Sequence, residues 1–137
     1  MEYFILFLIF SFLGVGIEVI FSSIHDYMKN KDISLKGRSY LWMFLLYGIW
    51  GLIIGPLYNL TKTIPFLLRG FIYLVVIFVG ELAYGYLLKL IIKKCPWKYK
   101  GRWTIKGIVN FLYLPFWLIF GYISEIIYRE FILITIY

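Results

Sequence analysis

Charged residues are scarce in this sequence, and so are the side chains on which most enzyme and metal sites depend. Only 15% of the 137 residues are charged, and there is one cysteine, Cys95, and one histidine, His25. A single cysteine excludes a disulfide within the chain and a cysteine-based metal site made by one copy. A single histidine excludes the HExxH pattern, and no serine lies in a nucleophile-elbow context with a histidine base. We therefore expect no metal, no other cofactor and no conventional hydrolase chemistry.

A phosphate-binding GxxxxGK[ST] loop is absent as well. The chain therefore cannot hydrolyse ATP by itself. An ATP-driven process would need a separate ATPase subunit.

Hydrophobic residues, by contrast, make up 63% of the sequence, and its mean hydropathy is +0.87. A soluble domain of this length cannot bury so much apolar surface, because small domains have a high surface-to-volume ratio. Lipid is the alternative solvent. A spanning helix needs roughly 20 apolar residues, so four spans and their loops use up the chain. We predict an all-α, multi-pass membrane protein with four transmembrane helices in one bundle, forming a single membrane domain over residues 1–137.

Four apolar runs define the expected helices, at about residues 3–24, 40–60, 66–92 and 107–128 or longer. Continuous runs of this length favour helices over a barrel, whose strands alternate apolar and polar residues. The first run lacks a basic start and a small-residue cleavage site, so we expect it to be retained. After the fourth run, FILITIY (131–137) either extends the helix or lies in the membrane interface.

The net charge of +7 would suggest a nucleic-acid partner in a soluble protein. Here the basic residues lie in loops between apolar runs, so we expect the lipid bilayer as a partner and no nucleic acid. Loops one and three share a side and hold eleven Lys and Arg residues, against three on the other side. The positive-inside rule predicts that these loops are cytoplasmic and both termini outside, in what we take to be a bacterial cytoplasmic membrane. The eleven are Lys29, Lys31, Lys36, Arg38, Lys89, Lys93, Lys94, Lys98, Lys100, Arg102 and Lys106, and the three are Lys62, Arg69 and Arg129.

Three glutamates, Glu18, Glu81 and Glu125, lie inside the apolar runs. Insertion scales give an acidic residue at a helix centre a cost of roughly 2.5–3.5 kcal/mol, so these side chains are not expected to face lipid. Helical spacing puts each of them on a face with polar or small residues. We predict an intramembrane polar site where the three faces converge. Its other candidate members are Ser11, Ser22, Tyr84 and Asn110.

Two interpretations of the glutamates are open at this point. In the structural one, each carboxyl is protonated or hydrogen-bonded and fixes the register of its helix. Glu125 would then pair with Arg129, one turn along. In the functional one, the carboxyls line a polar cavity for a proton, a cation or a headgroup, and no residue is assigned a catalytic role.

Glycines mark the expected packing faces. The second run carries Gly48, Gly51 and Gly55, and the last two form a small-xxx-small pair that permits close approach of backbones. Gly14 shares the face of Glu18 in the first run. We expect these glycines to pack helices within the chain, although a homodimer would use the same motif.

Three segments resemble a known family. SFLGVGIEVIF (11–21) is similar to the first-helix motif of the type IV ABC-transporter permease family, also called the CmpB family, and GRSYLWMFLLYGIWG (37–51) is similar to its second helix. RGFIYLVVIFVGELAYGYLLKLIIKKCPWKY (69–99) resembles the corresponding part of its animal relatives, the transmembrane protein 229 family. There an aromatic-rich helix with a central glutamate leads into a Cys-Pro-Trp-Asp-Tyr turn. The residues that carry over are Gly14, Glu18, Glu81, Cys95, Pro96, Trp97 and Tyr99.

The resemblance implies a small multi-pass membrane protein with a permease-like role. The sequence departs from the family at Lys98, where the turn usually has an acidic residue, and it lacks the Arg-Gly-Phe-Leu-x-Gly-Pro stretch of many bacterial members. These departures put in doubt a role that needs an acidic turn residue. Glu18 and Glu81 are unaffected.

Our first hypothesis is a permease-like component that moves a small polar or amphiphilic solute, with Glu18 and Glu81 lining its polar interior. A transporter of this size would need to dimerise or to use a separate ATPase subunit. The alternatives are an intramembrane enzyme that acts on a lipid with a glutamate as acid or base, and a structural or assembly factor.

Overall fold

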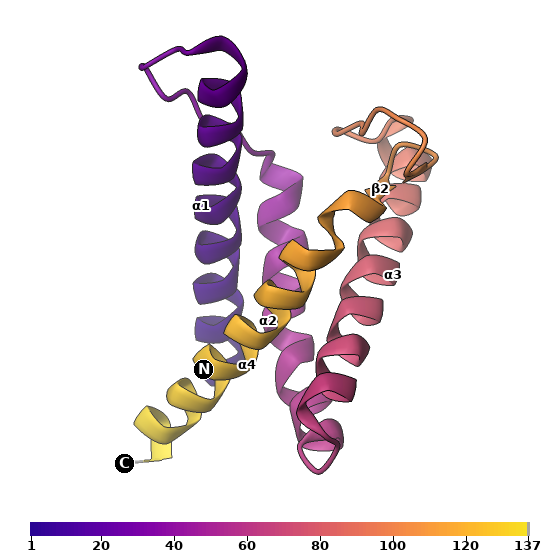
Figure 1. The fold of residues 1–137 in the computed structure, drawn as a ribbon. Coiled ribbons are helices and arrows are strands. Elements are labelled where there is room, and N and C mark those ends of the chain that lie inside the picture. Colours follow the sequence, from indigo (N-terminus) through magenta and orange to yellow (C-terminus); the bar gives the residue numbers. More distant parts are fainter. Residues whose placement is uncertain (137) are drawn as a thin grey trace. The chain divides into compact units, whose positions relative to one another are not determined.

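The computed structural model describes residues 1–136, most of which lie in long helices (Figure 1). In chain order the elements are α1 (Glu2–Asn30), α2 (Leu41–Thr61), α3 (Phe66–Ile92), β1 (Thr104–Ile105), β2 (Val109–Asn110), the 3₁₀ turn η1 (Phe111–Tyr113) and α4 (Leu114–Ile136). The two strands form a short antiparallel hairpin, the only sheet within residues 1–136. The predicted all-α class is confirmed.

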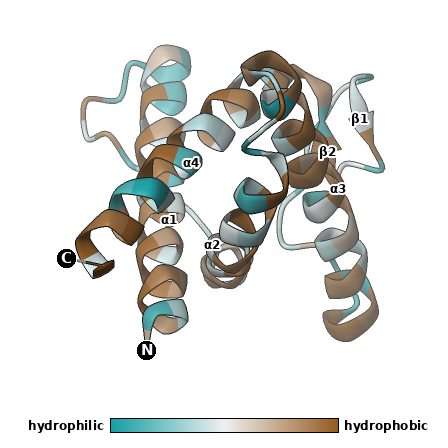
Figure 2. Ribbon diagram, turned by 90° about the horizontal axis from the view of Figure 1, so that it is seen from below, coloured by the Kyte–Doolittle hydropathy of each residue, from teal (hydrophilic) through white to brown (hydrophobic). Residues whose placement is uncertain are grey.

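Within residues 1–136, four helices are long and apolar enough to cross a membrane: α1, α2, α3 and the segment Phe111–Ile136 that contains α4. Figure 2 shows the helices coloured mainly as hydrophobic, and apolar side chains such as Leu41 and Leu67 are largely exposed. Such surfaces are unfavourable in water and suited to lipid tails. The prediction of a multi-pass membrane protein is confirmed.

The chain divides into two compact parts, Met1–Leu52 and Ile53–Tyr137, with the boundary inside α2. The first part contains α1, the first loop and the first half of α2. The second contains the rest of α2, α3, the hairpin and α4. The arrangement of all four helices as one bundle stays a prediction.

In the first part, α1 packs against α2 at positions that lack a Cβ atom. A side chain at Gly48 would collide with Phe7 and Ser11 on α1. A Cβ at Gly51 would come within 2.8 Å of the Cβ of Phe10. The glycines therefore permit the close approach of the two backbones.

The first helix ends at Asn30, later than predicted. Lys31 adopts a left-handed conformation, with φ of 56°, and its N–H donates to the carbonyl of Tyr27 at 2.7 Å, which closes the helix. The loop then returns along α1, where Ser22 Oγ accepts a hydrogen bond from the backbone N–H of Arg38 at 2.8 Å. Polar residues near the end of α1 thus hold the first loop.

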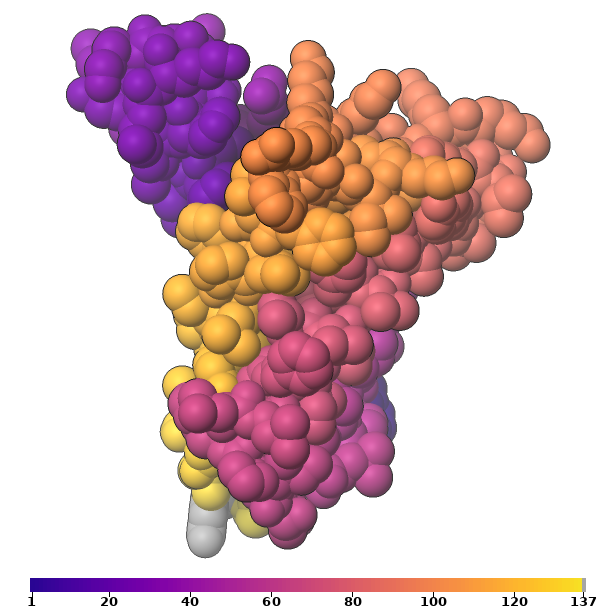
Figure 3. Space-filling model, turned by 45° about the vertical axis from the view of Figure 1, so that its right-hand side comes forward, coloured from indigo at the N-terminus to yellow at the C-terminus, as the bar shows by residue number. Residues whose placement is uncertain are grey.

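In the second part, α3 and α4 run in opposite directions (Figure 1), and their side chains meet in the space-filling view (Figure 3). Gly70 makes room for the ring of Tyr122. A Cβ atom added to Gly121 would lie only 2.8 Å from the Cβ of Tyr73. The ring of Tyr122 also stacks on Phe66, with centroids 4.1 Å apart. Small residues on each helix therefore accept aromatic rings from the other.

The fourth helix begins at Leu114, not near residue 107 as predicted. Lys106 and Gly107 have positive φ angles of 52° and 70°, and they reverse the chain between the two strands. Asn110 then caps η1, because its side chain accepts a hydrogen bond from the N–H of Leu112 at 3.0 Å. Pro115 follows in the first turn of α4, where a missing N–H costs no helical hydrogen bond.

At its far end α4 continues to Ile136. Residues 131–136 of the FILITIY segment therefore extend the helix, which is one of the two predicted alternatives. Tyr137 lies outside the described residues.

Candidate intramembrane polar site

Glu18 of α1 is held by two hydroxyl groups. Ser39, at the end of the first loop, donates to its Oε2 at 2.5 Å, and Tyr47 of α2 donates to its Oε1 at 2.8 Å. Glu18 itself is half-buried, whereas Tyr47 is buried. Both donors are neutral hydroxyl groups, and no ion pair of Glu18 is found within residues 1–136, so hydrogen bonds would solvate its ionised form.

The position of Tyr47 depends on Gly14, one helical turn before Glu18. A Cβ atom at Gly14 would overlap the ring of Tyr47, so only a glycine lets this ring cross α1 at that level. The hydroxyl then reaches the carboxyl on the next turn. Gly14 therefore makes room for the ring of Tyr47, and Glu18 accepts a hydrogen bond from its hydroxyl.

Glu81 lies at the middle of α3 and is almost completely buried. The hydroxyl of Tyr99, from the segment after α3, donates to its Oε1 at 3.1 Å. The ring of Tyr99 packs in turn against that of Tyr113, with centroids 5.2 Å apart. A tyrosine distant in sequence thus covers this carboxyl.

The segment that carries Tyr99 is fixed to α3 by aromatic and glycine contacts. Trp97 stacks on Tyr84, with centroids 6.2 Å apart, and its Nε1 donates to the carbonyl of Ile108 at 2.9 Å. The side chain of Ile108 occupies the space left by the missing Cβ of Gly85. Residues 93–110, which we call the basic hairpin, therefore fold back over the second half of α3.

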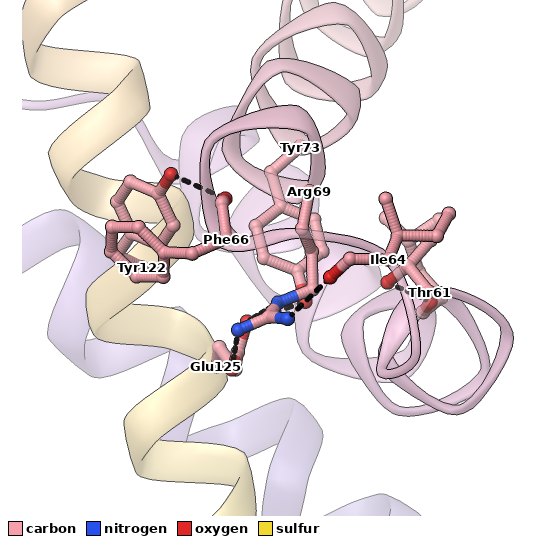
Figure 4. A network of polar contacts seen from close by, with 8 residues as sticks. Thr61, Ile64, Phe66, Arg69, Tyr73, Tyr122 and Glu125 are labelled. Carbon is pink, nitrogen blue, oxygen red and sulfur yellow. Dashed lines mark hydrogen bonds and ion pairs between the residues drawn. The ribbon is translucent and has the colours of Figure 1, made fainter.

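Glu125 of α4 forms an ion pair with Arg69 of α3 (Figure 4). Arg69 Nε lies 2.7 Å from Oε2 and Nη2 lies 3.0 Å from Oε1, so the pair is two-pronged. The hydroxyl of Tyr73 donates to Oε2 at 2.7 Å. Arg69 also donates to the carbonyl of Ile64 at 3.0 Å, which ties the turn before α3 to the network. This carboxylate is neutralised and well hydrogen-bonded.

The predicted pairing of Glu125 with Arg129 is not found. Arg129 is exposed on α4, and the partner of Glu125 comes from α3. The expected pairing rested on the four-residue spacing within one helix, whereas the actual partner, Arg69, lies in the first turn of another helix, α3. The spacing of Arg69 and Tyr73, four residues apart on one helical face, was the signal that could have found this network.

Glu81 and Glu125, the two predicted site glutamates of the second part, lie at different levels along α3. Glu81 lies eight residues beyond Tyr73 on α3, so its surroundings are about 12 Å further along the helix than those of Glu125. Asn110 is not on a helix face with Glu125, because it belongs to β2 and caps η1. Glu81 and Glu125 therefore have different surroundings along α3, and the convergence of the three glutamate-bearing faces stays a prediction.

The other candidates have local roles. Ser22 binds the backbone of the first loop, and Tyr84 supports Trp97. Ser11 is fully buried beside Gly48, and its Oγ has no hydrogen-bond partner among residues 1–136.

The remaining glycine and turn residues also have definite surroundings. Gly55 on α2 faces the ring of Tyr128 on α4, whose nearest atom is 2.7 Å from where a Cβ would lie. Cys95 and Pro96 are partly buried in the bend after α3. Burial raises the pKa of the Cys95 thiol. Cys95 is therefore mostly a neutral thiol near neutral pH.

No group of three or more His, Cys, Asp or Glu side chains within residues 1–136 could hold a metal ion. Glu18 and Glu81 are carboxyls that accept hydrogen bonds from hydroxyl groups, whereas Glu125 is paired with an arginine. Such carboxyls can exchange a proton or bind a small cation or a polar group.

Comparison with known sequences gives one family over nearly the whole chain. A sequence model of the family described as "Putative ABC-transporter type IV" (CmpB) matches residues 5–136. No solved structure matches the chain. The predicted resemblance to the CmpB family is confirmed, whereas that to the transmembrane protein 229 family stays a prediction.

Proposed function

The chain belongs to the putative type IV ABC-transporter (CmpB) family, and from this premise we propose that it is a permease-like membrane component with a polar intramembrane site. Family membership supports the class of function, and the surroundings of Glu18 support the site. Glu18 lies in an apolar helix, is half-buried, and has two neutral donors. A carboxyl of this kind can take up a proton or a cationic or polar group without first breaking an ion pair.

Glu81 is the second member of the proposed site. It is buried more deeply than Glu18, and the Tyr99 hydroxyl that reaches it belongs to the basic hairpin rather than to a spanning helix. Movement of the hairpin would therefore change the surroundings of this carboxyl. We propose that Glu81 responds to hairpin movement, whereas Glu18 contacts the solute.

Glu125 is not part of the proposed site. Its two oxygens are occupied by Arg69 and Tyr73, and the guanidinium neutralises its charge. Opening this pair would leave a buried charge without compensation, at a high free-energy cost. Its role is to join α3 to α4.

The partner that supplies energy would be a separate ATPase, because the chain has no phosphate-binding loop of its own. We further propose that loops one and three face the cytoplasm, where such a subunit resides, and that both termini lie outside. The charge bias between loops supports this orientation.

The experiment that tests the site is complementation of a deletion strain of the source cell. Cells are compared by the small molecules that they retain and release, with membrane levels of each variant measured in parallel. We expect E18Q and E81Q to reach normal levels in the membrane and to fail to restore the wild-type profile. The matched control E130Q removes a carboxylate from an exposed position on α4 and should restore it.

Full restoration by the E18Q/E81Q double variant would refute the polar site. The transport class is tested separately, by purifying the tagged chain in mild detergent and measuring ATPase activity that co-purifies. We expect such activity to be lost when the Walker lysine of the associated subunit is replaced. Absence of any ATPase subunit from the purified complex would contradict the permease role, whatever the glutamate variants do.

A further inference from the structure

We propose that the exposed face of the basic hairpin is a binding site for the headgroups of anionic phospholipids. Its basic residues are all exposed, and the sequence has no acidic residue between Glu81 and Glu125. The surface therefore carries positive charge that no acidic residue nearby in the sequence neutralises. These basic residues are Lys93, Lys94, Lys98, Lys100, Arg102 and Lys106.

The fold separates the two kinds of side chain in this segment. Trp97 and Ile108 are buried against α3, and Tyr99 reaches inward to Glu81. Lys98 and Lys100, which flank Tyr99, are exposed. Aromatic and apolar contacts thus anchor the hairpin from below and hold the cationic groups on its outer face.

An exposed tryptophan accompanies the charges. Trp103 is 52% exposed, and the guanidinium of Arg102 lies over its ring, 5.4 Å from the centroid. Tryptophan side chains favour the headgroup level of a membrane, where the ring meets acyl chains and the cation meets phosphate. This pair fits a lipid surface better than it fits an acidic protein surface.

The location of the basic hairpin indicates which ligand is near it. It connects α3 directly to the segment Phe111–Ile136, and both are spanning helices, so the hairpin lies at a membrane surface. Polybasic segments next to spanning helices are attracted to anionic leaflets, with an affinity gain of about fivefold for each Lys or Arg. The bilayer that surrounds the chain offers these headgroups at high local concentration.

The polar segment of residues 25–38, which comprises the end of α1 and the first loop, lacks the same combination. Its basic residues are interspersed with Asp26 and Asp32, and Asp26 lies 3.9 Å from Arg38. Hydrogen bonds from Ser34 lower the pKa of Asp32, which therefore stays ionised. No tryptophan occurs in that loop. It provides a matched control, because three basic residues can be replaced there, as in the hairpin, without touching the proposed site.

The test is a lipid titration of the full-length chain in a nonionic detergent. Phosphatidylglycerol or phosphatidylcholine is added in increasing mole fraction, and the thermal unfolding midpoint gives the half-saturating amount. We expect phosphatidylglycerol alone to raise the midpoint of the wild-type protein, and about 0.5 M salt to abolish the shift by screening. The variant K98Q/K100Q/R102Q should need at least about tenfold more phosphatidylglycerol. The control K29Q/K31Q/K36Q, which removes the same charge from the first loop, should behave as wild type.

Three results would overturn the proposal. One is an equal change in the unfolding midpoint of the wild-type protein with the two lipids, which would favour an acidic protein as the partner instead. Another is an equal loss in the first-loop control, which would reduce the effect to net charge. The third is an equal shift with inorganic phosphate in place of lipid. If the triple hairpin variant does not fold, K100Q alone should still raise the half-saturating amount by about fivefold, and no change would count against the site. The lipid site does not depend on the transport role.

Discussion

Arg69 and Glu125 join α3 to α4 through a two-pronged ion pair in which the side chains are 14% and 5% exposed. An ion pair so shielded is costly to create and costlier to break, because removal of one partner leaves the other charge buried. The pair also holds the turn before α3, through the carbonyl of Ile64. It is therefore the polar contact most expected to control the stability of the second part of the chain.

We predict that R69M and E125L each lower the free energy of unfolding by about 3–5 kcal/mol. The double variant R69M/E125L should lose much less than the sum, because it leaves no unpaired charge. Denaturant unfolding in detergent, followed by tryptophan fluorescence, measures the three values. R129Q is the control, and it should stay within about 0.5 kcal/mol of wild type because Arg129 is exposed. Simple additivity of the two single losses would contradict a direct coupling.

Two glycines of α1 offer a second matched comparison. We predict that G14A destabilises the protein by about 1–3 kcal/mol, because the new methyl group overlaps the ring of Tyr47. G16A should be neutral or stabilising by up to about 1 kcal/mol, since a Cβ there meets nothing within 4 Å. The thermal unfolding midpoints of the two variants give the answer. Equal unfolding midpoints of G14A and G16A would contradict the close packing of the Tyr47 ring against Gly14.

Much of the fold could be predicted from sequence because it follows from hydropathy. The four apolar runs are long, and the extents of α2 and α3 agree with them to within a residue or so. The start of α4 was missed because residues 107–113 are apolar enough to pass for helix. There the backbone is decided by a turn at Lys106 and Gly107 and by the cap at Asn110. Hydropathy does not register such turn geometry.

The polar contacts could be predicted only in part. Placing Glu18, Glu81 and Glu125 in spanning helices needed only their position in apolar runs. Their partners Ser39, Tyr99 and Arg69 lie 21, 18 and 56 residues away. Helical periodicity orders residues on one helix, but it says nothing about which residue of another segment meets them. Loop closure and tertiary packing decide those pairs.

The docking of the basic hairpin on α3 should depend on Gly85. We predict that G85A displaces Ile108 and opens the hairpin, since a Cβ would overlap that side chain. Limited trypsin digestion of the detergent-solubilised protein should then cut residues 93–106 several times faster than in wild type. G80A, on the same helix, places a Cβ in open space and is the control. Unchanged digestion of G85A would show that the hairpin is held by other contacts.

The thiol of Cys95 reports on the same docking. Burial raises its pKa, so at any given pH the folded protein has less thiolate than a free cysteine. The folded protein therefore binds the thiol proton more tightly than the unfolded chain does. This contribution to the free energy of unfolding is fully present below the pKa of a free thiol, and it is lost as the pH rises through the pKa of the folded protein. We predict that maleimide modification is slow at pH 8 and that its pH profile is shifted upward. G85A should restore a profile closer to that of a small thiol, and an ordinary profile in the wild-type protein would contradict burial.

The same cysteine can decide the orientation of the chain, because it is the only one and lies in the third loop. If loops one and three are cytoplasmic, a membrane-impermeant maleimide added to intact cells should leave Cys95 unmodified, whereas a permeant one should modify it. Long reaction times at pH above 8 compensate for the low thiolate fraction. The control is K62C in a C95S background, which moves the cysteine to the turn between α2 and α3. That position should react with the impermeant reagent, because an odd number of spans separates it from Cys95. The reverse pattern would place the basic loops outside and would remove the cytoplasmic face that the proposed ATPase partner needs.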